Sequence, residues 1–280
     1  MVRNGIALVV ACVVLLGVGL AVVLAKQPRG FITLAAPGAN PDAIPAFARM
    51  LTAEVVMVGK VVSVEKEPVV DGQASFTVAK VKIEEGLTGT KNLTHVTVGF
   101  LKSGGPQLAE GEQYLFFLAK HPTAGFHLMP WNMVPIASKD AKFKAAVAEV
   151  TKATATLKQP VAALKADKPA DRGLAAVVLL TRYRTPPPNV RQLENEDLPE
   201  EESKLLLKAL ADADWTNGDG PNGPNGFTAF RGLALTQRDG WTPPGVKPGG
   251  NAVEEYKKAY AAWLEDKGKE YRVKKLVPKK

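Results

Sequence analysis

The chain has very few of the side chains that most often carry chemistry. Its 280 residues include one cysteine, Cys12, and three histidines, His95, His121 and His127. A single cysteine cannot form a disulfide within the chain, so the folded part must be stabilised by packing. The histidines have no cysteine or aspartate beside them at metal-ligand spacing. No nucleophile-elbow, zinc-protease or phosphate-loop motif occurs. The sequence therefore assigns no catalytic, metal or cofactor-binding residue, and it predicts no cofactor.

Two fragments of enzyme motifs and two pairs of acids are weaker candidates. Ser63 and Lys66 form S-x-x-K, and residues 102–104 read K-S-G, but the two fragments are too close together and no S-D-N lies between them. Glu84 with Glu85, and Glu110 with Glu112, stand at predicted strand ends, where a glycosidase places its acid and base. Sequence does not give their separation. A hydrolase whose site is assembled from scattered residues stays open as the alternative function.

The first 26 residues form the most informative segment. Residues 5–25 carry no charge, Arg3 precedes them and Lys26 follows. A run of this length spans a bilayer as a helix, so residues 1–26 are expected to be a retained signal anchor or a cleaved signal peptide. Lipidation at Cys12, in a sequence that resembles a lipobox, is a third alternative. Each of these alternatives sends the following chain out of the cytoplasm, to the periplasm or cell surface.

A tether and a β-rich segment follow this leader. Residues 27–46 are rich in proline, alanine and glycine and are expected to lift the body off the membrane. Apolar residues then alternate, which predicts strands. The predicted strands are residues 55–65, 76–84, 96–100, 114–119 and 126–131. The apolar phase slips at Ala79 and Lys80, which predicts a β-bulge there. Five short strands with bulges are typical of a small closed Greek-key barrel, so residues 47–137 are expected to form an OB-like domain.

The strand sequences also resemble a known family over residues 47–135. VVMVGKVVSVE, FTVAKVKIEEGLTGT and LAEGEQYLFFLA resemble the netrin-like or tissue-inhibitor-of-metalloproteinase type of OB domain, as found in uncharacterised exported bacterial proteins. The resemblance implies an OB fold. The animal inhibitors insert an N-terminal cysteine into a protease's metal site. This chain has no such cysteine, so the resemblance transfers no inhibitory residue.

Helical periodicity dominates residues 138–280. Helices are expected at 141–157 after Ser138 as a cap, at 172–183 after Asp171, and from Pro199 to about residue 214. Asn251 and Glu254 form a capping box for a last helix with an aromatic stripe. An aromatic stripe of this kind is most often a core contact. This helical region could equally be a separate domain.

The loop at 215–227 contains the sequence NGDGPNGPNG. Asp219, Asn217, Asn222 and Asn225 offer oxygen ligands of the kind that calcium prefers. The EF-hand order is absent, because no glutamate closes the loop. Turn chemistry explains the same composition, so the loop is interpreted as a surface loop.

The net charge is +8, and much of the excess lies in the C-terminal tail from Lys267 to Lys280. A basic tail can bind a protein partner or an anionic polymer, or it can be a frayed, solubilising terminus. An exported location disfavours nucleic acid as the partner.

Taken together, these patterns predict an α+β protein with an N-terminal transmembrane helix, a small OB-like five-stranded β-barrel and a following helical region. The expected function is a non-catalytic binding or assembly module outside the cytoplasm, held at the membrane by the N-terminal helix.

Overall fold

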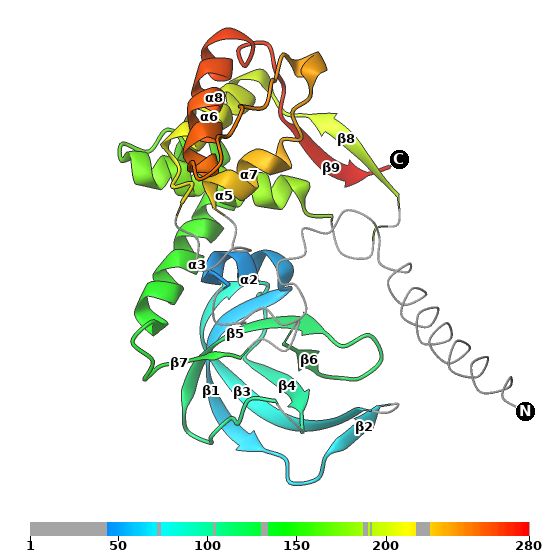
Figure 1. Ribbon diagram of the computed structural model, residues 1–280. Helices are drawn as coiled ribbons and strands as arrows, with labels where there is room; N and C mark the ends of the chain where they lie inside the picture. The colour runs from blue at the N-terminus through cyan, green and yellow to red at the C-terminus, as the bar shows by residue number, and fades with distance from the viewer. Residues whose placement is uncertain are drawn as a thin grey trace, which may run out of the picture.

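The computed structural model describes residues 44–71, 74–102, 105–129, 134–186, 190, 192–216 and 225–279. Within these residues the protein is α+β: a mixed sheet comes first in the chain and a helical region follows (Figure 1). The leader (1–26), nearly all of the tether (27–46) and Cys12 lie outside the described residues, so their predicted roles stay predictions. Among the residues described, no helix combines the length and the apolar composition needed to cross a bilayer.

The sheet is built from seven strands. Their bounds are β1 Val55–Val64, β2 Val69–Asp71, β3 Ala74–Thr88, β4 His95–Leu101, β5 Gln113–Lys120, β6 His127–Leu128 and β7 Ile136–Ala137. The first four predicted strands correspond to β1, β3, β4 and β5, and β5 is apolar on both faces because both are covered. Of the fifth predicted strand, 126–131, only His127 and Leu128 are in a strand among the described residues, and residues 130 and 131 are not described.

The main strands follow a Greek-key order. β5, β1, β3 and β4 are neighbours in that order, so the fourth strand of the series returns beside the first. The two-residue β6 pairs with β4 in parallel and with β5 in antiparallel orientation. The hydrogen bonds therefore join β1, β3, β4, β6 and β5 into a ring within a mixed sheet. This ring is the part of the predicted five-stranded barrel that the structure shows.

The predicted bulge is on the wrong strand. β3 and β4 pair without interruption from Phe76 to Lys82, so Ala79 and Lys80 are regular. At this point the extra residue is Val62 of β1, between Val61, which pairs with Val81, and Ser63, which pairs with Lys80; β3 has its own extra residues further along, at Glu84 and Leu87. The apolar phase of β3 changes because both of its faces are buried in turn: Phe76 and Val78 join one cluster, and Ala79 and Val81 join another.

The helices lie before and after this sheet. Their bounds are α2 Ala46–Thr52, α3 Phe143–Lys158, α4 Pro160–Leu164, α5 Pro169–Arg184, α6 Glu200–Asp212, α7 Gly226–Gly232, the 3₁₀ turn η3 Gln237–Asp239, and α8 Ala252–Asp266. Strands β8 Leu193–Asp197 and β9 Lys274–Pro278, neither predicted, form a separate two-stranded sheet.

The predicted helix starts are partly correct. Asn251 caps α8 by accepting the Glu254 N–H, and Pro199 precedes α6 with three acids in its first turn. Two predicted caps are wrong. Lys142, without a side-chain bond, takes the capping position of α3 in place of Ser138. Asp171 lies inside the first turn of α5, because Pro169 starts that helix two residues earlier.

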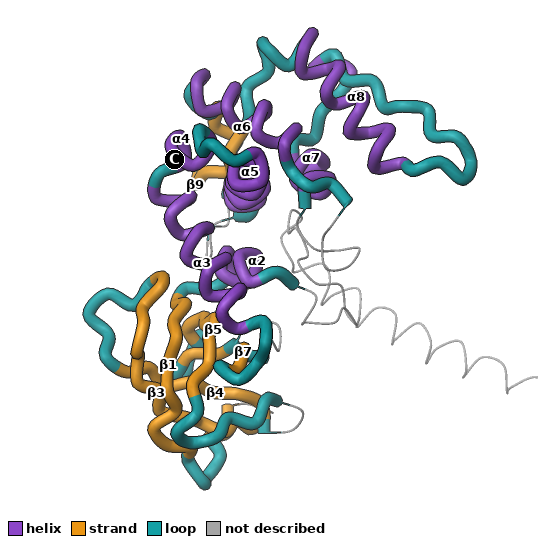
Figure 2. The backbone as a smooth tube through the Cα atoms, turned by 90° about the vertical axis from the view of Figure 1, so that its left-hand side faces the viewer, coloured by secondary structure: helices purple, strands orange, loops and turns teal. Residues whose placement is uncertain are grey.

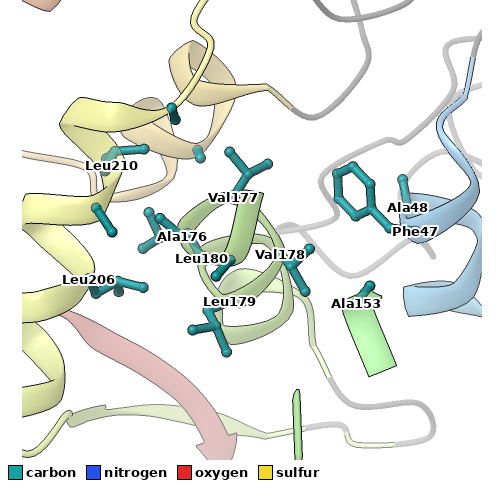
Figure 3. Close-up of a cluster of buried hydrophobic side chains, with 14 of the residues drawn as sticks. Phe47, Ala48, Ala153, Ala176, Val177, Val178, Leu179, Leu180, Leu206 and Leu210 are labelled. Atoms are coloured by element: carbon teal, nitrogen blue, oxygen red, sulfur yellow. The ribbon is translucent and has the colours of Figure 1, made fainter. Parts of the chain in front are cut away.

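One hydrophobic core joins the sheet to the helices. It contains Val56 and Val58 of β1, Leu115 and Phe117 of β5, and the buried residues of the helices. Figure 2 shows α2 and α3 between the sheet and the remaining helices. Figure 3 shows side chains of α6 on one side of α5 and side chains of α2 and α3 on the other: Leu206 and Leu210, then Phe47, Ala48 and Ala153. The helices therefore cover part of the outer face of β1 and β5.

Candidate functional site

His121 is the only buried histidine among the described residues, and it joins two loops of the sheet. Its Nδ1 accepts N–H bonds from Thr123 (3.2 Å) and Ala124 (3.0 Å). Its Nε2 lies 3.4 Å from Asp71 Oδ2, at the end of β2. Its ring packs against Phe76 and Phe126. These contacts fasten the β5–β6 loop to the β2–β3 hairpin.

This cluster is not arranged as a proton relay. In a relay the imidazole joins the acid to the nucleophile, with the acid on one ring nitrogen and the hydroxyl on the other. Here the Thr123 hydroxyl lies 3.3 Å from His121 Nδ1, but it donates its proton to the same Asp71 oxygen at 2.7 Å, and two backbone N–H groups already donate to Nδ1. The hydroxyl proton and the imidazole lone pair are thus both engaged. The cluster stabilises a loop and leaves no free nucleophile.

Neither of the other two histidines belongs to a group of metal ligands among the described residues. His127 is in β6 and half-buried, and desolvation lowers its pKa from the ordinary value near 6.5. The Nδ1 of His95 contacts the neighbouring Thr94 hydroxyl at 3.2 Å. In the described part of the chain, no three His, Cys, Asp or Glu side chains gather closely enough to hold a metal ion.

The candidate acids serve structural contacts. Glu84 Oε2 accepts from Gln113 Nε2 at 2.5 Å, and Glu110 Oε1 accepts the Val64 N–H at 2.9 Å. Glu112 lies 3.4 Å from Lys139 Nζ. Glu85 is exposed on β3 opposite Val58. Ser63 lies within β1 and not at a helix start, so the S-x-x-K fragment has no catalytic setting.

The loop at 215–227, whose composition suggested calcium ligands, is only partly described. Residues 217–224, which include Asp219, Asn217 and Asn222, lie outside the described residues. Asn225 is used as the cap of α7, where its side chain accepts the Thr228 N–H at 2.9 Å. Asp214 accepts from Thr216, and Asp212 pairs with Arg172 at 2.8 Å. The neighbouring acids therefore already have partners.

The aromatic stripe of α8 is a core contact, as expected. Tyr260 is fully buried and Trp263 is 5% exposed. Their polar atoms also bond other elements: Tyr260 Oη donates to the Leu207 carbonyl at 2.7 Å, and Trp263 Nε1 donates to that of Asp239 at 2.8 Å. Trp215, Phe230 and Trp241 complete the cluster. This side of α8 is therefore occupied and is not a binding surface.

The basic tail is folded, so the prediction of a frayed terminus is wrong for residues 273–278. Val273 is 1% exposed, and its N–H donates to Ser203 Oγ at 2.9 Å. β9 then pairs with the acidic β8, whose sequence is LENED. Lys275 lies 3.0 Å from Glu196, and Arg272 lies 2.7 Å from Glu200. Internal acids thus compensate part of the positive charge of the tail.

A different basic surface lies on the outer face of the sheet. Four strands that are neighbours in the sheet place one side chain each in a row across it. The row is Gln113 of β5, Lys60 of β1, Lys82 of β3 and His95 of β4. Lys80 lies two residues before Lys82, opposite Thr97 of β4. Side chains alternate along a strand, and the adjacent Val61 and Val81 point into the core. The row therefore points outward. We call Lys60, Lys80 and Lys82, with Gln113, His95 and Thr97, the basic face.

The basic face begins where the helical cover ends. Val58 and Leu115, two residues from Lys60 and Gln113 along their strands, are buried in the core shared with the helices. Lys60, Lys80 and Lys82 are exposed. None of these three makes an ion pair with any residue that the structure describes. Lys60 and Lys82 face each other directly, an arrangement of like charges that costs stability in a sheet.

From the sequence, the barrel face and the aromatic helix with the basic tail were the two candidate surfaces, but the lysines of the basic face were not found. The three lysines are scattered over two segments, and their alignment depends on the register of β1 against β3. The signal was present in part, because Lys80 and Lys82 share one face of a predicted strand. No protein-family model matches this chain, and no curated protein sequence matches it significantly.

Proposed function

We propose that the protein is a non-catalytic binding module that works outside the cytoplasm and is held at the membrane by its first 26 residues. One observation carries this proposal: the sheet exposes three lysines that no described acid compensates, on a face that the helices leave open. Uncompensated charge of this kind costs stability in the free protein, and a negatively charged binding partner would relieve it.

The proposal includes the finer fold expected from the sequence. The Greek-key order and the ring closed by β6 support an OB-like barrel, a fold that hosts many ligand-binding proteins. The uncharged leader supports a membrane anchor or an export signal.

A hydrolase is the second candidate, and the contacts of the candidate acids count against it. Glu84, Glu110 and Glu112 each bond a nearby group of the sheet or its loops. Asp71 and His121 are committed to holding a loop.

The test is mild crosslinking of the full-length protein in its native membranes, followed by capture and identification of what is bound. We expect the captured material to persist in the single variants Glu85→Gln, Glu112→Gln and His127→Gln. We expect it to be lost in the triple variant Lys60→Gln, Lys80→Gln, Lys82→Gln. Point variants are required because truncation at residue 252 would remove the buried Tyr260 and Val273.

Turnover would contradict the proposal. If the wild-type protein hydrolyses any member of a panel of glycoside and ester substrates, and one of these single carboxyl or imidazole substitutions abolishes that turnover, the protein is an enzyme. An empty capture from native membranes would also count against a binding module.

A further inference from the structure

We infer that the basic face binds a linear acidic polysaccharide, which names the partner class of the proposed function and rests on it. The C-terminal tail contains more cations than the basic face, but β8 and α6 supply acids to that tail. On the basic face one acid, Glu84, follows Lys82 by two residues on β3; it accepts from Gln113 at 2.5 Å and forms no ion pair with any of the three lysines, so three positive charges stand against one negative charge. The sheet is therefore the better site for an anion.

The geometry of the lysines fits an extended polymer. Directly opposed residues in a sheet have Cβ atoms about 5 Å apart, and residues two apart on one strand are about 7 Å apart. Lys60 and Lys82 have the first relation and Lys82 and Lys80 the second. The three lysine side chains thus start from a bent line of positions on the sheet surface. A chain with regularly repeated negative charges can give each ammonium group its own counter-charge, whereas a single small anion would require all three flexible stems to converge on one point.

The surrounding side chains favour a sugar polymer over other polyanions. The lysines are flanked by groups that exchange hydrogen bonds with hydroxyls: the Gln113 side-chain carbonyl, whose Nε2 already donates to Glu84, the Thr97 hydroxyl and the His95 ring. No phenylalanine, tyrosine or tryptophan belongs to the basic face, whereas proteins that bind single-stranded nucleic acid stack its bases on aromatic rings. An anionic membrane surface also attracts clustered lysines, but docking of a folded domain on it gains further from several apolar side chains that enter the headgroup region. The exposed Val62 is the one apolar side chain beside Lys60 on β1.

The experiment measures binding of the full-length protein, in a neutral detergent, to dextran sulfate and to polygalacturonate, with neutral dextran as the blank. We expect both acidic polymers to bind and neutral dextran to fail. Affinity should fall as salt rises from 50 to 500 mM, because bound counter-ions are released on association. The variant Lys60→Gln, Lys80→Gln, Lys82→Gln should bind roughly tenfold or more weakly, since each exposed charge contact contributes a fraction of the binding energy.

Two control variants have the same net charge as this triple variant, and a third keeps the charge of the basic face. Lys158→Gln, Lys208→Gln, Lys247→Gln removes three exposed lysines of the helical region and should change affinity by no more than about twofold if the effect is local. Lys267→Gln, Lys269→Gln, Lys274→Gln tests the tail in the same way. Lys60→Arg, Lys82→Arg keeps the charge and should keep binding. Thermal melting of each variant confirms that it is folded.

Several outcomes would overturn the inference. They are equal losses in all three charge-removal variants, a larger loss in the tail variant, and absence of binding to either acidic polymer. Tighter binding to an oligodeoxynucleotide or to vesicles with anionic lipids than to both polysaccharides would reject the polysaccharide in favour of that partner. A protein captured through the basic face, with no polysaccharide bound, would leave the proposed binding function standing and reject this inference alone.

Discussion

At the scale of single residues, the polar side chains divide into those that hold the fold together and those that the fold leaves unused. Asp71, His121 and Thr123 bond one another or the backbone between two loops. Lys60 and Lys82 face each other without an acid partner. The first group resembles a catalytic cluster but has a structural role. The second group consists of exposed lysines that together form part of the basic face.

Replacing His121 tests the structural role of the first group. His121→Ala leaves two backbone N–H groups of the β5–β6 loop without an acceptor and removes ring contacts with Phe126. We expect a loss of about 2–3 kcal/mol in the free energy of unfolding, measured by urea denaturation. His121→Asn keeps an acceptor near the position of Nδ1 and should recover part of that loss. His95→Ala, at an exposed position, should change it by less than about 0.5 kcal/mol. Equal effects at His95 and His121 would show that the loop contacts contribute nothing.

Replacing Lys82 tests the second group. Lys82→Thr removes one of two directly opposed charges and introduces a residue with high strand propensity, so the protein should become more stable by about 0.2–1 kcal/mol. High salt should shrink the gain, because it screens the repulsion in the wild-type protein. Lys80→Thr, which faces Ser63 and not a lysine, should give a smaller gain. A loss of stability in both variants would mean that the lysines already have a stabilising partner.

At the scale of elements, helix α5 is the central helix of the core that joins the sheet to the helices. Residues 175–181 of α5 are buried along every face. Near its start, Gly173 lies against the end of α6. A Cβ atom built on Gly173 would lie 2.6 Å from Ala213 Cα and 2.8 Å from Ala213 N. The close approach of these two helices therefore requires a residue without a side chain.

The effect of Gly173→Ala separates helix propensity from packing. Alanine usually stabilises a helix interior by about 1 kcal/mol relative to glycine. Here the neighbouring atoms are backbone and cannot rotate away, so overpacking of about 1–3 kcal/mol should win and destabilise the protein. Gly232→Ala is the matched control, because the nearest atom to its Cβ is Arg184 Cγ at 3.6 Å. That variant should be neutral or slightly stabilising in chemical denaturation. A stabilised Gly173→Ala protein would show that α5 and α6 can separate at no cost.

At the scale of the whole molecule, one buried tyrosine and two partly buried ones tie the helical region together through their hydroxyl groups. Tyr260 and Tyr271 donate to backbone carbonyls of Leu207 and Leu233, and Tyr183 donates to Glu202. Burial raises the pKa of Tyr271 from 10 to about 12 and also raises those of Tyr183 and Tyr260. Each of these contacts requires the neutral phenol, so the fold depends on these protons.

Stability should accordingly fall at alkaline pH. A folded-state pKa above the unfolded value gives stability that is complete below pH 10 and is lost as the pH rises through about 12. For Tyr271 the loss should be about 1–2 kcal/mol, after discounting for its partial exposure. Melting temperatures measured from pH 8 to 12 check this. Tyr271→Phe should be less stable at pH 8 and fall less steeply above pH 10. Parallel curves for the two proteins would contradict the assignment.

How much of this could be predicted from sequence depended on whether the signal was local. The strands β1, β3, β4 and β5 and the cap at Asn251 were predictable because alternation and capping act within a few residues. The bulge at Val62 was misplaced because its position depends on how β1 pairs with β3. The strand β9 was missed because its partner β8 lies about 80 residues away and both strands are charged. The basic face was missed for the same reason, since pairing aligns Lys60 with Lys82.

The core shared by the sheet and the helices also has a consequence for the order in which the chain can fold. Val56 and Val58 come early in the chain, yet they are covered by a core that includes residues 175–180 of α5. The Phe47 N–H likewise donates to Glu149, 102 residues later. During synthesis at roughly 5–20 residues per second, the interval between β1 and α5 is on the order of ten seconds. The face formed by β1 and β5 exists once β5 is made, and about 50 further residues precede α5, so it stays uncovered for several seconds at that rate. A cell that makes this protein must protect that face until the helices arrive, whether inside an export channel or with a chaperone.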